Sequence, residues 1–359
     1  MKPATCLALL ALLLPSAGQA TDSITSCEPK GDITPLCQFR NPEDIVALPD
    51  QRTLLVSQMG NMEGTEPGSL VFFDTATGEV RPAYPAGTHQ AVAADWGTPD
   101  CPGEPDNRFA PHGLSLQQRH DGQWQLAVIN HGGRETVEMF ELQSQDGRFS
   151  LVWRGCVVPA EGTWMNDLAL MRDGGFVASH MFDKRAPHLF GMSTGLLKAL
   201  LGFNTGYVFE WLPGGKTRIL EGSRGPFLNG VALSPDESTV FANISTGKAL
   251  RRLDRASGTM TGSVAIRQPD NLSWDKNGKL LTAGVTASLA AQQSCSKHHG
   301  ETCAAAFAIY RIDPVTLQSE VILQQEGAPM GAGTVAQPLG DFLYIGSYTG
   351  NRILRVPYR

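Results

Sequence analysis

The sequence predicts an all-β fold: one six-bladed β-propeller with four-stranded blades and a short helical insertion over one mouth, in a single domain of residues 21–359. A polar or Gly-rich anchor, a short alternating strand, a turn and a second strand recur six times. Another hairpin with a Gly-containing turn follows most copies. Successive copies lie 41 to 69 residues apart, counted from Glu43, His112, Asn166, Asn229, Asp270 and Gly333. Four short strands per unit at such a loose period are typical of propellers.

The six anchored hairpins follow one another along the whole chain. They are PEDIVALPDQRTLLVSQ from Pro42, PHGLSLQQRHDGQWQLAVINH from Pro111, MNDLALMRDGGFVASH from Met165, LNGVALSPDESTVFANI from Leu228, DNLSWDKNGKLLTAG from Asp270 and AGTVAQPLGDFLYIGS from Ala332. The last unit ends at NRILRVPYR, one strand short. We expect the segment around residues 34–39 to supply the missing strand and close the ring.

Helical periodicity is scarce, and residues 192–203, MSTGLLKALLGF, are its main exception. Ser193 or Thr194 can cap this helix, and four leucines form a stripe. Inside an all-β repeat, the helix is an insertion over one mouth of the propeller. It could cover exposed strand edges, form a substrate lid or make a weak membrane or lipid contact.

Composition and charge limit the partners. Of the 359 residues, 42% are hydrophobic and 18% charged, which is enough apolar material for a large core. The net charge is −6 and the pI is near 5.8, so nucleic acid and anionic membranes are poor main partners.

Residues 1–20 resemble a secretory signal peptide. Lys2 precedes an apolar run from Leu7 to Leu14, and Pro15 and small residues lead to a cleavage site after Ala20. The run is too short to span a bilayer, and no other run is long enough. The protein is expected to be exported, to a periplasm or to the extracellular space.

Six cysteines remain after this cleavage, which favours disulfides in an oxidising compartment. The closeness of Cys27 to Cys37 and of Cys295 to Cys303 suggests two local bridges, which leaves Cys101 for Cys156. Sequence alone does not decide among the possible pairings. The stretch CSKHHGETC, with His298 and His299, could alternatively be a zinc site, although its spacing fits no common zinc pattern.

The anchors themselves indicate a metal site. The first strand of each blade runs along the central channel, so its leading residues converge at one end. Carboxylate and amide oxygens without thiolates suit calcium, which takes six to eight oxygens in irregular geometry, whereas magnesium resists such dehydration. The oxygen-bearing candidates are Glu43, Asp44, Asn166, Asp167, Asn229, Asp270 and Asn271. Any single pair could merely satisfy a turn backbone. Turn backbones do not explain the whole set, because buried adjacent carboxylates repel each other and need a cation to compensate their charge.

The stretches PEDI, FAPHGLS, VINH, NDLAL, NGVALSPD and PDNLS, in that order, resemble the serum paraoxonase/arylesterase family. This family lies within the senescence-marker/gluconolactonase group of six-bladed propellers. The similarity spans residues 41–356. No single stretch is specific for this family, but the occurrence of all six in the same order along the chain is.

The resemblance implies two calcium ions in the central tunnel. The catalytic ion would be held by Glu43, Asn166, Asn229, Asp270 and Asn271. The structural ion would be held by Asp44, Asp167 and the backbone carbonyl of Leu114. The family's catalytic histidine pair falls on His112 and His131, a tunnel histidine on His180, and a pocket aromatic on Phe227.

These roles predict a calcium-dependent hydrolase of lactones or aryl esters. Calcium would polarise the substrate carbonyl, and His112 would act as the base toward water while His131 fixes its tautomer. Alternatively, His112 only shapes the pocket and His131 only hydrogen-bonds within the core. A sugar lactonase of the gluconolactonase type and a calcium-stabilised binding propeller also remain open.

Two departures from the family limit what can be carried over. Animal members join the chain ends with a disulfide, whereas no cysteine follows Cys303 here. Ring closure must therefore depend on strand pairing or on another bridge. Where animal members have a His-Pro-Asn stretch lining the pocket, this chain has TAGVTASLAAQQSC, small residues and an insertion. Substrate choice is therefore open.

Overall fold

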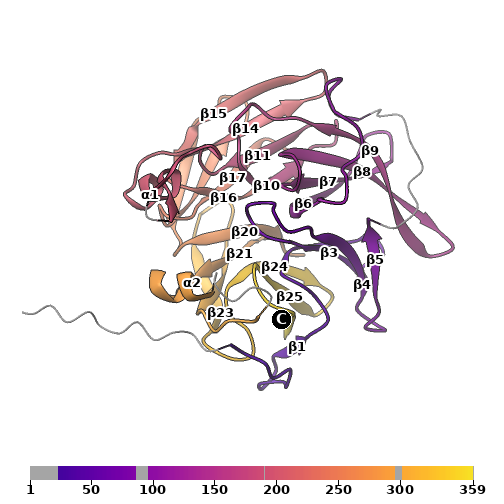
Figure 1. The fold of residues 1–359 in the computed structure, drawn as a ribbon, viewed down its shortest axis with the longest axis vertical. Coiled ribbons are helices and arrows are strands. Elements are labelled where there is room, and N and C mark those ends of the chain that lie inside the picture. The colour runs from indigo at the N-terminus through magenta and orange to yellow at the C-terminus, as the bar shows by residue number, and fades with distance from the viewer. Residues whose placement is uncertain (1–22, 86–95, 190, 296–300, 359) are drawn as a thin grey trace, which may run out of the picture.

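A computed structural model describes residues 23–85, 96–189, 191–295 and 301–358. The predicted signal peptide, residues 1–20, and His298 and His299 lie outside the described residues. The chain forms six antiparallel four-stranded sheets (Figure 1). The innermost strands contact one another in a closed ring, with the last against the first. The predicted six-bladed propeller is therefore confirmed.

Each blade is an up-and-down meander. The first blade consists of β2 (Pro42–Ala47), β3 (Thr53–Gln58), β4 (Ser69–Asp74) and β5 (Val80–Tyr84), and the second of β6 (Pro111–Gln118), β7 (Trp124–Asn130), β8 (Thr136–Gln145) and β9 (Arg148–Val157). The third consists of β10 (Met165–Leu170), β11 (Phe176–His180), β14 (Gly206–Leu212) and β15 (Lys216–Gly225), and the fourth of β16 (Leu228–Leu233), β17 (Thr239–Ile244), β18 (Ala249–Asp254) and β19 (Met260–Ala265). The fifth consists of β20 (Pro269–Trp274), β21 (Leu280–Val285), β22 (Phe307–Ile312) and β23 (Ser319–Gln325). Apolar side chains of neighbouring sheets pack into the core clusters between blades.

The two ends of the chain meet in the sixth blade. There β1 (Thr34–Leu36) pairs with β26 (Ile353–Pro357), beside β25 (Phe342–Ser347) and β24 (Gly333–Leu339), as the sequence predicted. The guanidinium of the fully buried Arg352 donates to the carbonyls of Ile24 at 3.0 Å, of Pro329 at 3.1 Å and of Ser26. Strand pairing and this buried arginine thus join the ends without a disulfide between them.

Every innermost strand carries one extra residue near its start. In β10, Asn166 and Asp167 lie between the paired residues Met165 and Leu168, whereas β11 has only Ser179 opposite them. The same register shift occurs in β2, β6, β16, β20 and β24. Such a β-bulge breaks the alternation of side chains, so two successive residues can serve one region of the channel. This geometry explains why polar residues stand in adjacent pairs at strand starts.

Two short helices interrupt the blades, and both lie on the same side of the molecule (Figure 1). Helix α1 (Thr194–Leu200) was predicted, and the Ser193 hydroxyl caps it by accepting from the Gly195 N–H at 3.2 Å. The strands β12 (His188–Leu189) and β13 (Met192–Ser193) form a small separate ribbon before it. Helix α2 (Leu289–Cys295) was not predicted, because its residues LAAQQSC contain no apolar stripe like the leucines of α1.

Exposed apolar side chains follow α1 at Leu201 and Phe203. The proposed lipid contact of this helix stays a prediction. No helix in the described part of the chain is both long and apolar enough to cross a membrane.

Three disulfides join the pairs that the spacing suggested: Cys27–Cys37, Cys101–Cys156 and Cys295–Cys303. Three disulfides are typical of proteins from an oxidising compartment. Because Cys295 and Cys303 are bonded to each other, the alternative zinc site would lack its thiolate ligands.

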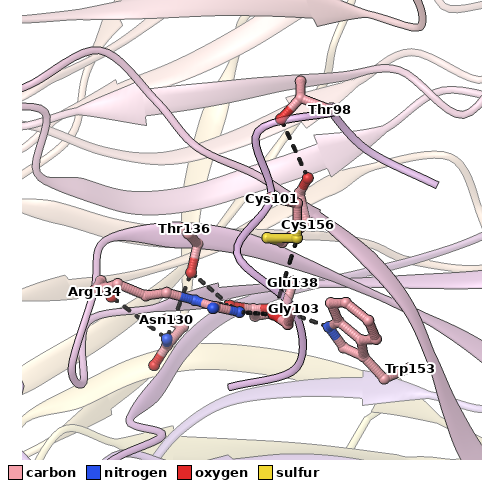
Figure 2. Close-up of a disulfide and its surroundings, with 9 residues drawn as sticks. All are labelled: Thr98, Cys101, Gly103, Asn130, Arg134, Thr136, Glu138, Trp153 and Cys156. Atoms are coloured by element: carbon pink, nitrogen blue, oxygen red, sulfur yellow. Dashed lines mark hydrogen bonds and ion pairs between the residues drawn. A yellow bond between two sulfur atoms is a disulfide. The ribbon is translucent and has the colours of Figure 1, made fainter. Parts of the chain in front are cut away.

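The Cys101–Cys156 bridge lies beside a buried polar cluster (Figure 2). The Glu138 carboxylate accepts from the Arg134 guanidinium at 2.8 Å and from the Trp153 indole at 2.9 Å. Arg134 also donates to the Gly103 carbonyl at 2.6 Å, on the segment that the disulfide fastens to β9. The bridge and the cluster together fix the loop after β7, which carries His131.

Removing the Cys101–Cys156 bridge by a double Cys→Ser substitution should lower the free energy of unfolding by about 4 kcal/mol. The bridge closes a chain separation of 55 residues and restricts the unfolded chain accordingly. Urea unfolding of the double variant measures this loss. The matched Cys295→Ser/Cys303→Ser variant, which opens a separation of only 8 residues, is the control and should lose less. Equal losses in the two variants would contradict the loop-length explanation.

Candidate active site

A cavity of about 560 Å³ lies at the end of the channel where the innermost strands begin. Its lining includes six of the predicted site residues: Glu43, His112, Asn166, Phe227, Asn229 and Asp270. A second cavity of about 450 Å³ lies further along the same strands, and Asp44, Leu114 and Asp167 line it. Asn271, His131 and His180 are buried behind these walls. The structure therefore brings the predicted residues together in two layers along one channel.

Three asparagines near the first cavity share one hydrogen-bonding pattern, in which the amide NH₂ has a partner and the amide oxygen has none. The amide NH₂ of Asn271 donates to Glu43 Oε1 at 2.9 Å, that of Asn166 contacts Met181 Sδ at 3.6 Å, and Asn229 donates to the Asp270 carboxylate. Each amide nitrogen thus has a partner within the protein. The side-chain carbonyl oxygens of the three asparagines, in contrast, are buried and accept no hydrogen bond from the described residues.

Glu43 adds a fourth such oxygen. Its Oε1 contacts Asn271 and lies 3.3 Å from His112 Nε2, whereas Oε2 is buried without a described partner. An unpaired buried acceptor costs free energy, so four of them at one channel end need a compensating ligand. Because all four are oxygens and none is a donor, they fit a hard cation.

The carboxyl of Asp270 belongs to the same group. Burial raises its pKa well above the ordinary value and the nearby Glu43 raises it further, although the hydrogen bond from Asn229 opposes the shift. A bound cation would reverse this cost by favouring the ionised carboxylate. Among the described residues, no three His, Cys, Asp or Glu side chains are grouped as a metal site, so the donor set depends on the amide oxygens.

Asp44 and Asp167 have a different and repeated arrangement. Asp44 accepts from the N–H of Ile45 at 2.8 Å and, on the next blade, from the N–H of Leu114 at 2.7 Å. Asp167 accepts in the same way from Leu168 at 2.7 Å and from Val231 on its next blade at 2.8 Å. Each carboxylate therefore ties two neighbouring innermost strands together.

Burial of Asp44 and Asp167 opposes their ionisation. It raises the pKa of both well above the ordinary value; Glu43 adds to the shift of Asp44, and Asp44 to that of Asp167. A carboxylate oxygen has lone pairs beyond those that the backbone uses. Both groups can therefore also bind a cation.

A chain of four titratable groups runs from the cavity into the wall. His112 Nδ1 lies 2.8 Å from His131 Nε2, and His131 Nδ1 lies 2.9 Å from Glu135 Oε2. The Lys184 ammonium donates to the same Glu135 oxygen at 2.9 Å, and the Met165 N–H donates to Oε1 at 2.8 Å. Burial lowers the pKa of His131, although Glu135 opposes the shift. Burial would raise the pKa of Glu135, yet His131 and Lys184 keep it below the ordinary value.

Sequence reasoning missed Glu135 and Lys184. An acid four residues after His131, in HGGRE, was a possible signal for Glu135. No sequence pattern identified Lys184, because it reaches this site from the loop after another blade's second strand.

The remaining two predicted residues support the pocket wall. Phe227 lines the cavity and its ring lies 5.8 Å from that of Phe182. His180 lies outside the lining: its Nδ1 accepts from the N–H of Trp164 at 3.1 Å, and its ring lies 4.7 Å from that of Tyr207. In the structure His180 holds Trp164, which does line the cavity.

Comparison with known proteins gives a family and a fold. A family model described as Arylesterase matches residues 60–354. A gluconolactonase from Xanthomonas campestris superposes with a TM-score of 0.52 at 16% identity, covering 91% of this chain and 89% of that chain. A luciferin-regenerating enzyme gives a TM-score of 0.53 at 13% identity, covering 90% and 92%. No curated protein gives a significant match. At these identities the two structures show the shared fold alone.

Acid should destabilise the fold through His180. Burial lowers its pKa from 6.5 to about 4, so between these values the unfolded chain binds a proton that the folded protein does not. Stability is therefore lost as the pH falls through this window, by about 2–3 kcal/mol. His180→Gln keeps an acceptor for Trp164 but cannot titrate, so its loss of unfolding free energy between pH 7 and pH 4 should be smaller by that amount. Urea unfolding at both pH values measures it, and an unchanged pH dependence would show that His180 is not the group responsible.

Proposed function

The chain belongs to the arylesterase family, and on that premise we propose that it is a calcium-dependent hydrolase of lactones or aryl esters. The observation that carries the proposal is the set of four buried acceptor oxygens, on Glu43, Asn166, Asn229 and Asn271, that have no partner among the described residues. They lie beside an open cavity that can admit a small molecule.

We assign the catalytic ion to these four residues and Asp270, and a structural ion to Asp44, Asp167 and the Leu114 carbonyl. The buried carboxyls of Asp44, Asp167 and Asp270 all have raised pKa values, so each gains from a neighbouring cation. When bound, calcium supplies polarisation of the substrate carbonyl and stabilises the negative charge that develops on its oxygen.

The histidine pair provides the base in this proposal. Glu135, paired with Lys184, is an acceptor and so holds the proton of His131 on Nδ1. His131 Nε2 then accepts from His112 Nδ1–H, which leaves His112 Nε2 as the basic nitrogen at the cavity. His112 Nε2 can therefore take the proton of an attacking water. Glu135 acts through His131 as a positioning residue.

The cavity lining favours an ester with an apolar part. Met59, Phe182, Leu196, Leu200 and Phe227 contribute to one continuous lining together with the polar anchors. A sugar lactone would leave this apolar surface unused, which makes the gluconolactonase-type alternative the weaker one. A calcium-stabilised propeller that only binds a small molecule would use the same cavity, and the hydrolysis assay below distinguishes it from a hydrolase. We place the protein in a periplasm or outside the cell, in keeping with its disulfides.

Hydrolysis of phenyl acetate and of a medium-chain lactone should require both calcium and Asp270. Chelation with EGTA, or Asp270→Ala, should abolish turnover, because EGTA removes the cation that stabilises the negative transition state and Asp270→Ala removes a carboxylate that would hold this cation. Calcium should restore the chelated wild type and fail to restore Asp270→Ala. A folded, calcium-binding protein that is inert toward a lactone panel would instead support the binding propeller.

Glu135→Gln should lower kcat about a hundredfold or more and leave KM nearly unchanged. If the amide oxygen keeps the bond from the buried Met165 N–H, the new NH₂ takes the place of Oε2: the partly exposed Lys184 ammonium loses its acceptor there, and the NH₂ faces His131 Nδ1 and reverses the tautomers of both histidines. His112 Nε2 then carries a proton and cannot act as a base. Lys184→Met, the control, leaves the Glu135 acceptor in place and should change kcat only a few-fold. Wild-type kcat in Glu135→Gln would show that the pair does not depend on this carboxylate.

A further inference from the structure

Tyr348 lines the first cavity and has no part in the mechanism described so far. It follows β25, the second strand of the sixth blade, in the turn that leads to β26. Its half-buried ring packs against the buried cluster around the Cys295–Cys303 bridge. The bridge therefore holds this ring at the cavity wall.

The backbone on both sides of Tyr348 is also fixed. The buried Ser347 hydroxyl donates to the Gly331 carbonyl at 3.1 Å. The buried Thr349 hydroxyl donates to the Glu301 carbonyl, also at 3.1 Å. A side chain between two anchored neighbours has little freedom to leave the cavity, so its hydroxyl is preorganised there.

The Tyr348 hydroxyl makes no hydrogen bond with the described residues, and it is not one of the fully buried polar atoms. Two other hydroxyls of the lining are occupied by backbone carbonyls. Thr334 donates to the carbonyl of Glu43 at 2.6 Å, and Thr246 donates to that of Pro226 at 3.0 Å. Within the described lining, Tyr348 therefore retains a hydroxyl donor for a ligand.

This hydroxyl lies near Asp270. Burial raises the pKa of Tyr348, and the neighbouring Asp270 carboxylate raises it further, which places the two groups within electrostatic reach of each other. A tyrosine is protonated at neutral pH in any case, so its capacity to donate does not depend on this shift. A substrate held beside Asp270 would therefore lie next to the Tyr348 hydroxyl.

The place of Tyr348 in the ring indicates which substrate oxygen it can serve. The first blade, which carries Glu43, lies between the second blade with His112 and the sixth blade with Tyr348. His112 and Tyr348 therefore reach a substrate at the channel end from different sides. In the proposed mechanism the attacking water is assigned to His112 and the carbonyl oxygen to the ion, which leaves the departing oxygen without a partner. No Lys or Arg belongs to the described lining, so this oxygen meets no side-chain cation either.

We propose that Tyr348 is a further catalytic residue, whose hydroxyl donates a hydrogen bond to the leaving oxygen of the ester or lactone. The water oxygen bonds to the carbonyl carbon, and His112 takes one water proton. The bond from this carbon to the leaving oxygen then breaks, and its electron pair stays on that oxygen. The leaving oxygen takes a proton from the His112 imidazolium or from solvent, and Tyr348 keeps its own. This assignment depends on the proposed hydrolase function and adds a residue to the same site.

The test compares substrates whose leaving oxygens differ in basicity. Tyr348→Phe should lower kcat about thirtyfold for δ-valerolactone, which releases a strongly basic alkoxide, and at most about threefold for 4-nitrophenyl acetate. The hydrogen bond matters most where the leaving oxygen carries the most negative charge. Substituted phenyl acetates should give a steeper dependence of kcat on leaving-group basicity in the variant than in the wild type. Equal losses for all substrates, or no loss for any, would overturn the proposal.

Two controls accompany this variant. Phenylalanine keeps the ring that packs against the Cys295–Cys303 bridge, so the melting temperature of Tyr348→Phe should equal that of the wild type. Tyr310→Phe makes the same change on β22, outside the cavity lining, and should alter neither kcat nor its dependence on the leaving group.

Binding separates this proposal from the hydrolase proposal. Calorimetry of the calcium-loaded protein with 4-nitrophenolate, the leaving group itself, reports the donor without turnover. The wild type and Tyr310→Phe should bind it about tenfold more tightly than Tyr348→Phe does. This difference in a protein that hydrolyses no ester would support the donor and contradict only the hydrolase proposal. Equal binding by the wild type and Tyr348→Phe would contradict the donor even where hydrolysis is observed.

Discussion

Closure of the ring is the constraint on which the rest of the structure depends. Because β1 pairs with β26, the sixth blade is complete and β24 contacts β2. The six innermost strands must then begin around one channel end, and the bulge in each strand admits polar side chains there. Residues as distant in sequence as Glu43 and Asn271 meet at 2.9 Å for this reason. The buried Arg352, which fastens the first described residues to the last blade, thus supports the site from outside it.

The channel concentrates groups that are costly to bury. Carboxyls with raised pKa values and oxygens without partners are unfavourable in a protein interior unless a ligand compensates them. The left-handed residues before the innermost strands add backbone strain at the same end. The proposed function accounts for this cost: a bound cation would offset the unfavourable free energy of the buried carboxyls and of the oxygens that lack partners.

The two walls of the cavity differ in origin. The polar anchors belong to the propeller repeat and could be predicted from it, since each stands at the start of an alternating strand. Other residues of the cavity lining belong to insertions. Helix α1 could be predicted from its leucine stripe, whereas α2 has no such stripe and ends at the Cys295–Cys303 bridge. Groups on strands are held more precisely than groups on insertions, whereas insertions vary more readily among related proteins.

The sequence by itself determined the six-bladed fold, the strand that closes it and the residue types gathered at the channel end, and it suggested the three disulfide pairs that the structure contains. These follow from local properties, such as strand alternation, turn spacing and cysteine separation. The tertiary structure alone decided which oxygens lack partners, how Glu135 and Lys184 meet His131, and that the Tyr348 ring packs against the cluster around the Cys295–Cys303 bridge. Such contacts depend on the orientation of side chains from separate blades and insertions, and no periodic pattern in the chain encodes that orientation.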